Sequence, residues 1–419
     1  MNEKPTVVER VIGLDAHPDT FTAAILRGPT PAAAVVEQTF NRVPLAQLPG
    51  WAKKHTTAQD LFVLEASGNS FHIVRVLAAI NRPALVLESG HLGKLKEAHA
   101  NNDKISAVRI GKAYLAGTAK VVWVPDPKTQ ARRDLFFAHR KAVKHTTQAR
   151  NRLLSYLSDH GVRLPPGTPL AQGAAAELQL RSLKEWTADQ WQILTGLLLE
   201  LQQASELRAH WHRLIAQAVL ADPLLLSLVR LGGIREVVAF ALGAIIGDPQ
   251  RFTHPKKLVK YVGLNPAFDD SGNSEWRGGI GGHGRKDLRA LLIEAAHALL
   301  RSGRTPLAQW GKKLLARKGS LHLAVAAVAR KLTVAVWYWL QGHATPLTEI
   351  DPPLALKVGK LLSKIGPAGF QQLGQTRLAL RQQAYQSLIA RVYVLQPDRK
   401  FNPARPPEKT APPTEKSGG

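Results

Sequence analysis

The sequence predicts a mixed α/β domain, followed by a long basic helical arm and an all-helical C-terminal domain. Short apolar strands alternate with helices up to about residue 127. Two long segments with helical spacing come next, and then apolar helices separated by glycine-rich turns. The chain has 419 residues, of which 45% are hydrophobic. That is enough apolar material to bury the cores of two or three domains.

The N-terminal domain is predicted from strands that end in acidic residues. We expect strands over residues 10–15, 21–28, 33–40 and 61–64, and another from Ala84. Asp15 and Glu65 stand at the ends of two of these strands, and Asp103 lies in the first turn of a later helix. Open sheets place their sites at the ends of strands, so we expect Asp15 and Glu65 at one edge.

Long helices are predicted after Pro127. We expect them over about 129–160 and 185–221, joined by a linker rich in proline and glycine. An antiparallel arm and a helical layer packed on a core both remain open. The first helix carries the cations Arg132, Arg133, Arg140 and Lys144.

The predicted parts have the following bounds. The α/β domain covers 1–127, the basic arm 128–222 and the C-terminal domain 223–342, which includes an element resembling a helix-hairpin-helix around Gly232 and Gly233. A helical extension covers 343–396, and a tail over 397–419 is too polar and proline-rich to fold.

Charge and cysteine content restrict the chemistry. Lys and Arg total 56 against 31 acidic residues, a formal net charge of +25, which indicates a polyanionic partner. There is no cysteine, which excludes disulfides, thiolate zinc sites and thiol nucleophiles. We expect neither a signal peptide nor a membrane span, because the apolar stretch 321–340 contains Arg330 and Lys331.

Residues 261–301 contain a glycine-rich stretch that leads into a basic helix. Glycines let backbone N–H groups approach a phosphate closely, and a helix N-terminus adds its own donors. Arg285, Lys286 and Arg289 add full charges there, and Ser271 stands in a turn at the entrance. A plain loop before an amphipathic helix is the alternative reading of this segment.

Several motifs together resemble a known family. They are GLDAH, LEASGN, NDKIS, LVKYVGLNP and SGNSEWRGGIGGHGRKDLRALLIEAA, spread between about Val11 and Gly342. This set is similar to the DEDD insertion-sequence transposases related to the Piv DNA invertase. The resemblance implies a RuvC-like (RNase H-like) N-terminal domain that holds Mg²⁺ on four acids. It also implies a C-terminal domain with a serine nucleophile, DNA recombination, and a structured guide RNA.

The resemblance assigns individual residues. Asp15, Glu65 and Asp103 match the first three acids, whereas Ser106 stands where the family has the fourth. A serine brings no negative charge, so we expect a weakened second metal position; Asp126 is a possible substitute. The nucleophile matches Ser271, with Ser274 as competitor. Arg277, Arg285, Lys286 and Arg289 would stabilise the reacting phosphate.

Three functions remain open at this point. The leading one is a transposase or DNA invertase that acts on element ends and target DNA, in the cytoplasm at the nucleoid, as a dimer or tetramer. A metal-dependent nuclease or junction resolvase would use the acids and leave Ser271 structural. A catalytically decayed nucleic-acid binder would follow from the loss of the acid at Ser106.

Overall fold

A computed structural model of the chain describes residues 9–90, 103–117, 119–271, 274–343 and 347–389. The chain divides into two compact units, which we call unit 1, up to Asp126, and unit 2, from Pro127. The predicted tail at 397–419 lies outside the described residues.

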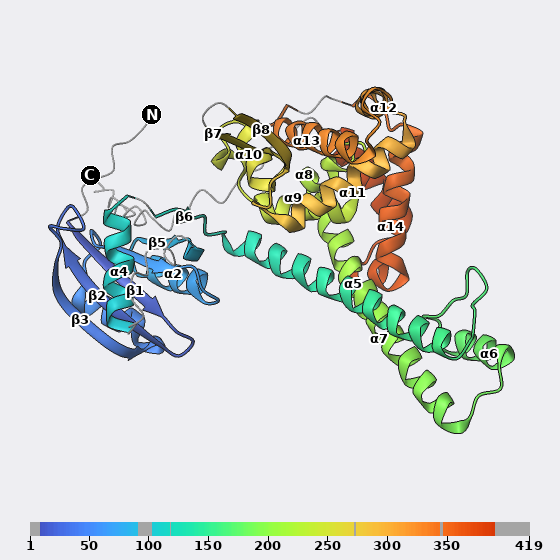
Figure 1. Cartoon of the computed structure of the whole chain (residues 1–419), viewed down its shortest axis with the longest axis horizontal. Helices are drawn as coiled ribbons and strands as arrows, with labels where there is room; N and C mark the ends of the chain where they lie inside the picture. Colours follow the sequence, from blue (N-terminus) through green and yellow to red (C-terminus); the bar gives the residue numbers. More distant parts are fainter. Residues whose placement is uncertain (1–8, 91–102, 118, 272–273, 344–346, 390–419) are drawn as a thin grey trace, which may run out of the picture. The chain divides into compact units, whose positions relative to one another are not determined.

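Unit 1 is built on a six-stranded mixed sheet (Figure 1). Its strands are β1 (Arg10–Ala16), β2 (Thr20–Arg27), β3 (Val35–Pro44), β4 (Leu61–Glu65), β5 (Ala84–Leu87) and β6 (Val121–Val122). They lie in the order β3-β2-β1-β4-β5-β6. The pairs β1–β2, β2–β3 and β5–β6 are antiparallel, whereas β1–β4 and β4–β5 are parallel. The predicted mixed α/β domain is therefore confirmed.

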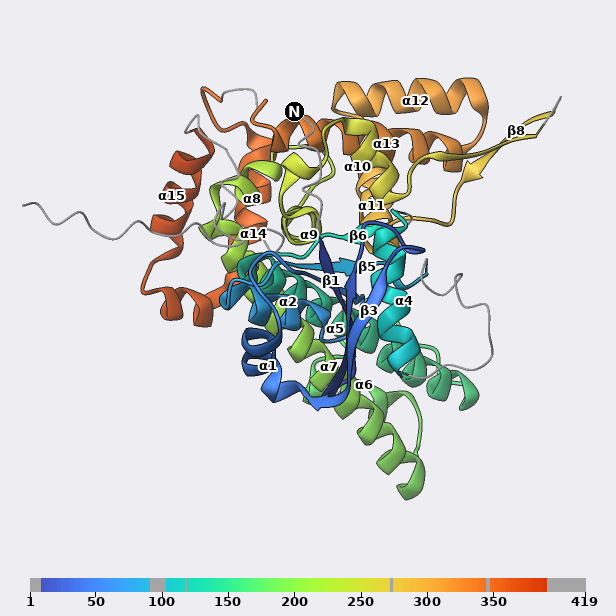
Figure 2. The same ribbon diagram turned by 90° about the vertical axis from the view of Figure 1, so that its left-hand side faces the viewer.

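Helices cover both faces of this sheet. Helices α1 (Leu48–His55), which follows the 3-10 turn η1 (Leu45–Gln47), and α2 (Ser70–Ala79) lie on one face, and α4 (Asp103–Leu115) lies on the other (Figure 2). Strand alternation explains the division. Ile12 and Leu14 belong to the core beneath α1 and α2, whereas Val11 packs with Ile110 of α4.

Unit 2 is mostly helical. Its helices are α5 (Pro127–Asp159), α6 (Gly173–Leu183), α7 (Ala188–Ala221), α8 (Pro223–Leu228), α9 (Glu236–Ile246), the 3-10 turn η2 (Pro249–Arg251), α10 (Pro255–Val262), α11 (Lys286–Ser302), α12 (Pro306–Lys318), α13 (Leu321–Leu340), α14 (Pro352–Leu373) and α15 (Arg377–Ile389). Helices α5 and α7 run antiparallel, since Thr146 contacts Ala204 while Tyr156 contacts Gln190. Their distal halves and α6 enclose a separate small core.

Helix α13 is long and apolar enough to cross a membrane by length and composition alone, the only such helix among the described residues. Half of its most apolar window is buried within the protein. Its buried side chains, among them Val328, Leu332 and Val336, belong to the main core of unit 2. This packing is what a core helix of a folded unit shows.

An antiparallel hairpin interrupts the helices of unit 2. Strands β7 (Pro266–Ser271) and β8 (Ser274–Ile280) pair with Ser271 opposite Ser274. The expected all-helical C-terminal domain thus needs a correction, and part of the expected glycine loop, including Gly278 and Gly279, is strand. A glycine-rich strand with little side-chain patterning is hard to distinguish from a loop in sequence.

Candidate functional site

Unit 1 gathers two carboxylates and an imidazole at the carboxyl end of β1. Asp15, His17 and Asp103 each present one ligand atom, and these atoms all lie within 4.8 Å of one another. Asp15 is the penultimate residue of β1, His17 follows in the turn to β2, and Asp103 begins α4. The two sequence-predicted acids are thus brought together, and His17 joins them.

A glycine allows α4 to lie close enough for this. A Cβ on Gly13 would stand 2.0 Å from the carbonyl oxygen of Ala107 in α4, so any side chain there would force the helix off the sheet. Gly13 and Asp15 point to the same face of β1, and Asp103 lies one helical turn before Ala107. The close contact at Gly13 therefore fixes Asp103 beside Asp15.

The backbone of His17 is held from both sides. Its N–H donates to the carbonyl of Thr20 over 2.8 Å, and its own carbonyl accepts from Asn69 Nδ2 over 2.8 Å. Asn69 belongs to the LEASGN motif, so one motif holds the end of the other. His17 Nε2 lies 3.6 Å from Asp103 Oδ1, and Arg42 Nε lies 3.7 Å from Asp103 Oδ2.

The other predicted acids lie nearby or elsewhere. Glu65 is one residue beyond the paired positions Leu14 and Leu64, so it shares the strand edge and the α4 face with Asp15. It is not part of the 4.8 Å group, nor is Asp126, which directly precedes α5. Ser106 follows Asp103 by three residues on α4 and is half-buried.

In unit 2, the hairpin of β7 and β8 carries Ser271 and Ser274, and we call it the serine hairpin. Gly263 before the hairpin and Gly284 after it are in contact with each other. Gly263 follows α10 with φ of +82°, and Gly284 precedes α11 with φ of +91°. A Cβ on Gly263 would stand 2.1 Å from the His283 carbonyl, and one on Gly284 would stand 2.7 Å from the Gly263 nitrogen. Positive φ and close approach both require glycine here. The side chains of Ser271, Ser274 and Arg277, together with Gly272 and Asn273, lie outside the described part.

Two of the predicted phosphate-binding arginines have partners within the chain. Arg285 makes a bidentate pair with Asp287, with Nη2–Oδ2 at 2.7 Å and Nε–Oδ1 at 3.1 Å. Burial acts to raise the pKa of Asp287, but the hydrogen bonds and charge of Arg285 outweigh it and lower that pKa. Arg289 Nη1 lies 2.9 to 3.1 Å from the carbonyl oxygens of Gly263, Gly281 and His283. Lys286, by contrast, is exposed.

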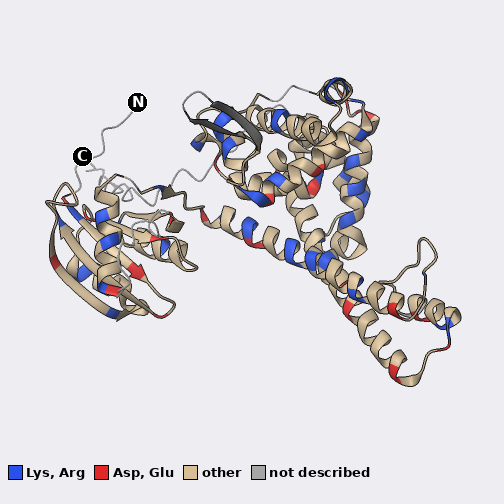
Figure 3. Ribbon diagram, viewed as in Figure 1, with Lys and Arg blue, Asp and Glu red and all other residues tan. Residues whose placement is uncertain are grey.

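The cations of α5 also divide into those with partners within the chain and those that are exposed. Arg133 is buried, donates to the carbonyls of Ala244 and Ile245 at the end of α9, and has its pKa lowered by burial to about 10. Arg132 pairs with Asp222. Arg140 and Lys144 are exposed, and Figure 3 shows Lys and Arg recurring along α5 and α14. Only the exposed cations present their charge to a partner.

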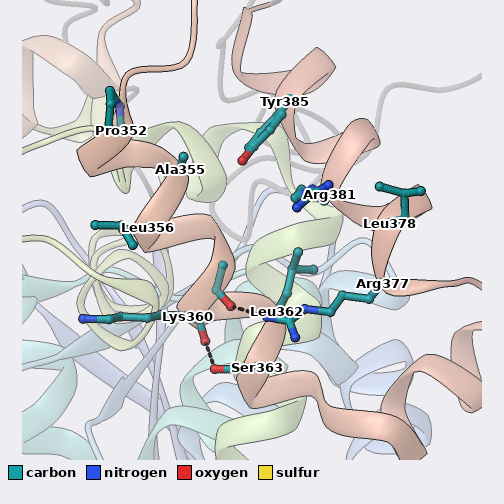
Figure 4. Close-up of a pocket in the computed structure, with 11 residues that line it drawn as sticks. Pro352, Ala355, Leu356, Lys360, Leu362, Ser363, Arg377, Leu378, Arg381 and Tyr385 are labelled. Atoms are coloured by element: carbon teal, nitrogen blue, oxygen red, sulfur yellow. Dashed lines mark hydrogen bonds between the residues drawn. The ribbon is translucent and has the colours of Figure 1, made fainter.

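A groove between α14 and α15 was not anticipated from the sequence. It encloses about 980 Å³ and includes the side chains shown in Figure 4, among them Leu356, Lys360, Arg377, Leu378, Arg381 and Tyr385. Residues 352–389 contain no Asp or Glu, so this surface is basic. The absence of acids over 38 positions was the signal that sequence reasoning passed over.

Comparisons with known proteins agree on one class, the transposases. A family described as "Transposase IS116/IS110/IS902 family" matches residues 227–310, which include the serine hairpin. The transposase for insertion sequence element IS1111A of Coxiella burnetii is 26% identical over 68% of this chain and 78% of its own length. The transposase for insertion sequence element IS1328 of Yersinia enterocolitica is 22% identical over 72% of this chain and 89% of its own.

A putative transposase of Sinorhizobium fredii (strain NBRC 101917 / NGR234) is 27% identical, over 56% of this chain. The match spans 57% of that relative's length. Taken with the family match across the hairpin, these similarities relate the chain to transposases of the IS110 family.

Proposed function

We propose that this chain is a transposase that breaks and rejoins DNA, with an acidic metal site in unit 1 and a serine nucleophile in unit 2. The observation that carries the proposal is the convergence of Asp15 and Asp103, which come from different elements, within 4.8 Å. The family match over the serine hairpin supports the second half. We also propose that unit 1 is RuvC-like, and that the chain is organised in the five parts predicted from the sequence.

The donor set at the edge of unit 1 fits a divalent cation. Carboxylate oxygens are the ligands that Mg²⁺ prefers, and Asp15, Asp103 and the neighbouring Glu65 supply them. A bound Mg²⁺ would supply charge stabilisation at the phosphate. Ser106 can contribute a hydroxyl oxygen from the same helix. Asp15 and Asp103 would hold and orient the cation.

Ser271 is the proposed nucleophile of unit 2. Its oxygen attacks the phosphorus, so that an Oγ–P bond forms while the P–O3′ bond breaks and the serine proton is given up to the leaving 3′ oxygen. A 3′-hydroxyl from a partner strand then reverses the step, which conserves the number of phosphodiester bonds. Lys286 and Arg277 would stabilise the charge on the phosphate. Arg285 and Arg289 already make contacts within the chain, so they would contribute their charge to the phosphate more indirectly.

The partners follow from the distribution of charge. The net charge of +25, the exposed cations of α5, and the basic groove of α14 and α15 support binding to DNA and to a structured guide RNA. Apolar walls beside cations suit nucleic acid whose bases are accessible. We also propose a dimer or tetramer that acts in the cytoplasm, because two duplexes must be joined.

Denaturing electrophoresis tests this function. Purified protein is incubated with Mg²⁺, element-end DNA and co-purifying RNA, and wild type is compared with Ser271→Ala and Asp15→Ala. The proposal expects a protein–DNA adduct in wild type alone. Free nicked DNA that survives Ser271→Ala would instead indicate a nuclease that uses water.

A further inference from the structure

The histidine that ends the GLDAH motif has no role among the four family acids, yet it lies inside the acidic group. His17 Nε2 is shielded from solvent although the side chain as a whole is 44% exposed. This nitrogen makes no hydrogen bond, and its nearest charged neighbour is Asp103 Oδ1 at 3.6 Å. A shielded ring nitrogen without a hydrogen bond, directed at carboxylates, is placed as a ligand would be.

The backbone that carries this ring is held in place. Hydrogen bonds to Thr20 and from Asn69 hold His17 at both its N–H and its carbonyl. A ligand needs such support, because a side chain on a free turn would lose conformational entropy on binding. The ring therefore reaches Asp15 and Asp103 from a turn that two other elements hold in place.

The fourth acid of the family pattern is missing from the same group. Ser106 stands there with a neutral hydroxyl. The site therefore has one carboxylate fewer than the four of the family. His17 brings a strong neutral donor to within 4.8 Å of the acids. Among the described residues, it is the only histidine in a group of this kind.

We propose that His17 is a metal ligand that makes up for the missing fourth acid, and that it shifts the preference of the site from Mg²⁺ toward Mn²⁺. This inference rests on the proposed function, since it assumes that Asp15 and Asp103 hold a divalent cation.

The shift in preference follows from ligand chemistry. Mg²⁺ takes oxygen ligands and retains its waters, so an imidazole adds little to its affinity. Mn²⁺ accepts carboxylates and also imidazole nitrogen, as the first-row divalent metals do. A site of two carboxylates and one imidazole therefore gains more for Mn²⁺ than for Mg²⁺.

Electron paramagnetic resonance on the full-length protein tests the inference without any activity measurement. Titration with Mn²⁺ gives its affinity, and competition with Mg²⁺ gives the ratio of the two affinities. Spin-echo modulation from a coordinated ¹⁴N reports the imidazole directly. The variants are His17→Ala, His17→Gln, and His17→Ala combined with Ser106→Asp. The control is His72→Ala, which removes an exposed histidine from α2 on the opposite face of the sheet.

The inference expects nitrogen modulation in wild type and in His72→Ala, and its loss in both His17 variants. Their Mn²⁺ affinity should fall by roughly tenfold or more, with a much smaller change for Mg²⁺. Adding Ser106→Asp to His17→Ala should restore binding without nitrogen modulation and with the Mg²⁺ preference of an all-carboxylate site. Circular dichroism verifies that each variant is folded.

Two results would overturn the inference, and they differ in what else they affect. Wild type that binds Mn²⁺ without nitrogen modulation, with the same affinity ratio in His17→Ala, removes the role of His17 and leaves the acid site standing. Wild type that binds neither Mn²⁺ nor Mg²⁺ also removes the acid site of the proposed function.

Discussion

The acidic edge of unit 1 and the basic end of the hairpin in unit 2 were both predicted from charged residues, but the structure uses those charges differently. In unit 1, Asp15 and Asp103 converge from separate elements with His17 beside them. In unit 2, Arg285 is paired with Asp287, and Arg289 lies against three backbone carbonyls. The acids form a group suited to a ligand, whereas these two cations already have partners within the chain.

The difference has a physical origin. A carboxylate at a strand end is placed by the topology of the sheet, at the edge where open α/β sheets bind their ligands. An arginine has five donors and a long side chain, so it readily satisfies carbonyls at helix ends and turns. Arg133 and Arg251 do this at the end of α9. Acids at strand ends are therefore the better guide to a site.

The largest expected effect is on DNA cleavage, when a carboxylate of the acidic group in unit 1 is removed. Asp103→Asn should reduce DNA cleavage at least about a hundredfold, because it removes a charge from the metal group. Asp19→Asn is the matched control, an exposed acid in the same turn as His17, and it should cleave at the wild-type rate. Initial rates of adduct formation measure both. Equal losses in the two variants would show that net charge, and not the group, controls the rate.

The next effect concerns the backbone contact that supports the hairpin of unit 2. Gly284→Ala should lower the free energy of unfolding by about 3 kcal/mol, since it forces a Cβ into Gly263 at positive φ. A Cβ on Gly282 would meet nothing within 4 Å, so Gly282→Ala should change little. Urea unfolding of both variants measures the difference. Similar midpoints for the two would contradict the contact.

A buried histidine of unit 2 gives a pH effect of similar or smaller size. Burial, with the charges of His212 and Arg208, lowers the pKa of His139 to about 4. The unfolded chain, with a pKa near 6.5, then binds a proton more readily than the folded one. Stability should therefore fall, by up to about 3 kcal/mol, as pH drops from about 6.5 to about 4.

His139→Gln should remove this part of the pH dependence. Unfolding free energies of wild type and variant at pH 7 and pH 5 provide the measurement, and parallel losses in the two would count against the assignment. The titration of the nearby Glu236 lies outside the range from pH 7 to pH 5. Burial acts to raise its pKa, but the hydrogen bond from His212 and other contacts lower it to about 2, so its contribution is lost only below about pH 4.5.

The smallest effects separate binding cations from structural ones. Arg140→Gln and Lys144→Gln remove exposed charges of α5, so each should reduce the salt dependence of nucleic-acid binding by about one unit of slope. Arg289→Gln removes a charge as well, but it should leave the slope nearly unchanged and lower stability instead, because the guanidinium of Arg289 holds backbone carbonyls. Filter binding at several salt concentrations measures the slopes. A loss of slope in Arg289→Gln as large as in Arg140→Gln would show that Arg289 is a binding cation.

The sequence anticipated the mixed sheet and the strand ends because alternation and buried apolar runs are local signals. It did not anticipate His17, although GLDAH contains it, because the conformation of a turn decides where the next side chain points. The hairpin was missed as well, since its glycines favoured a loop and masked the strand pattern. The partner of Arg285 lies only two residues away, but no pattern distinguishes a paired arginine from a phosphate-binding one.

The most direct test of the account is to identify the residue that becomes linked to DNA. The adduct formed by wild type is trapped and digested with trypsin, and the peptide that covers Tyr261 to Arg277 is sequenced by mass spectrometry. The account predicts a nucleotide on Ser271, formed only when Asp15 and Asp103 are intact. A nucleotide on Ser274 would identify Ser274, and not Ser271, as the nucleophile. Cleaved DNA without any linked peptide would contradict the serine mechanism.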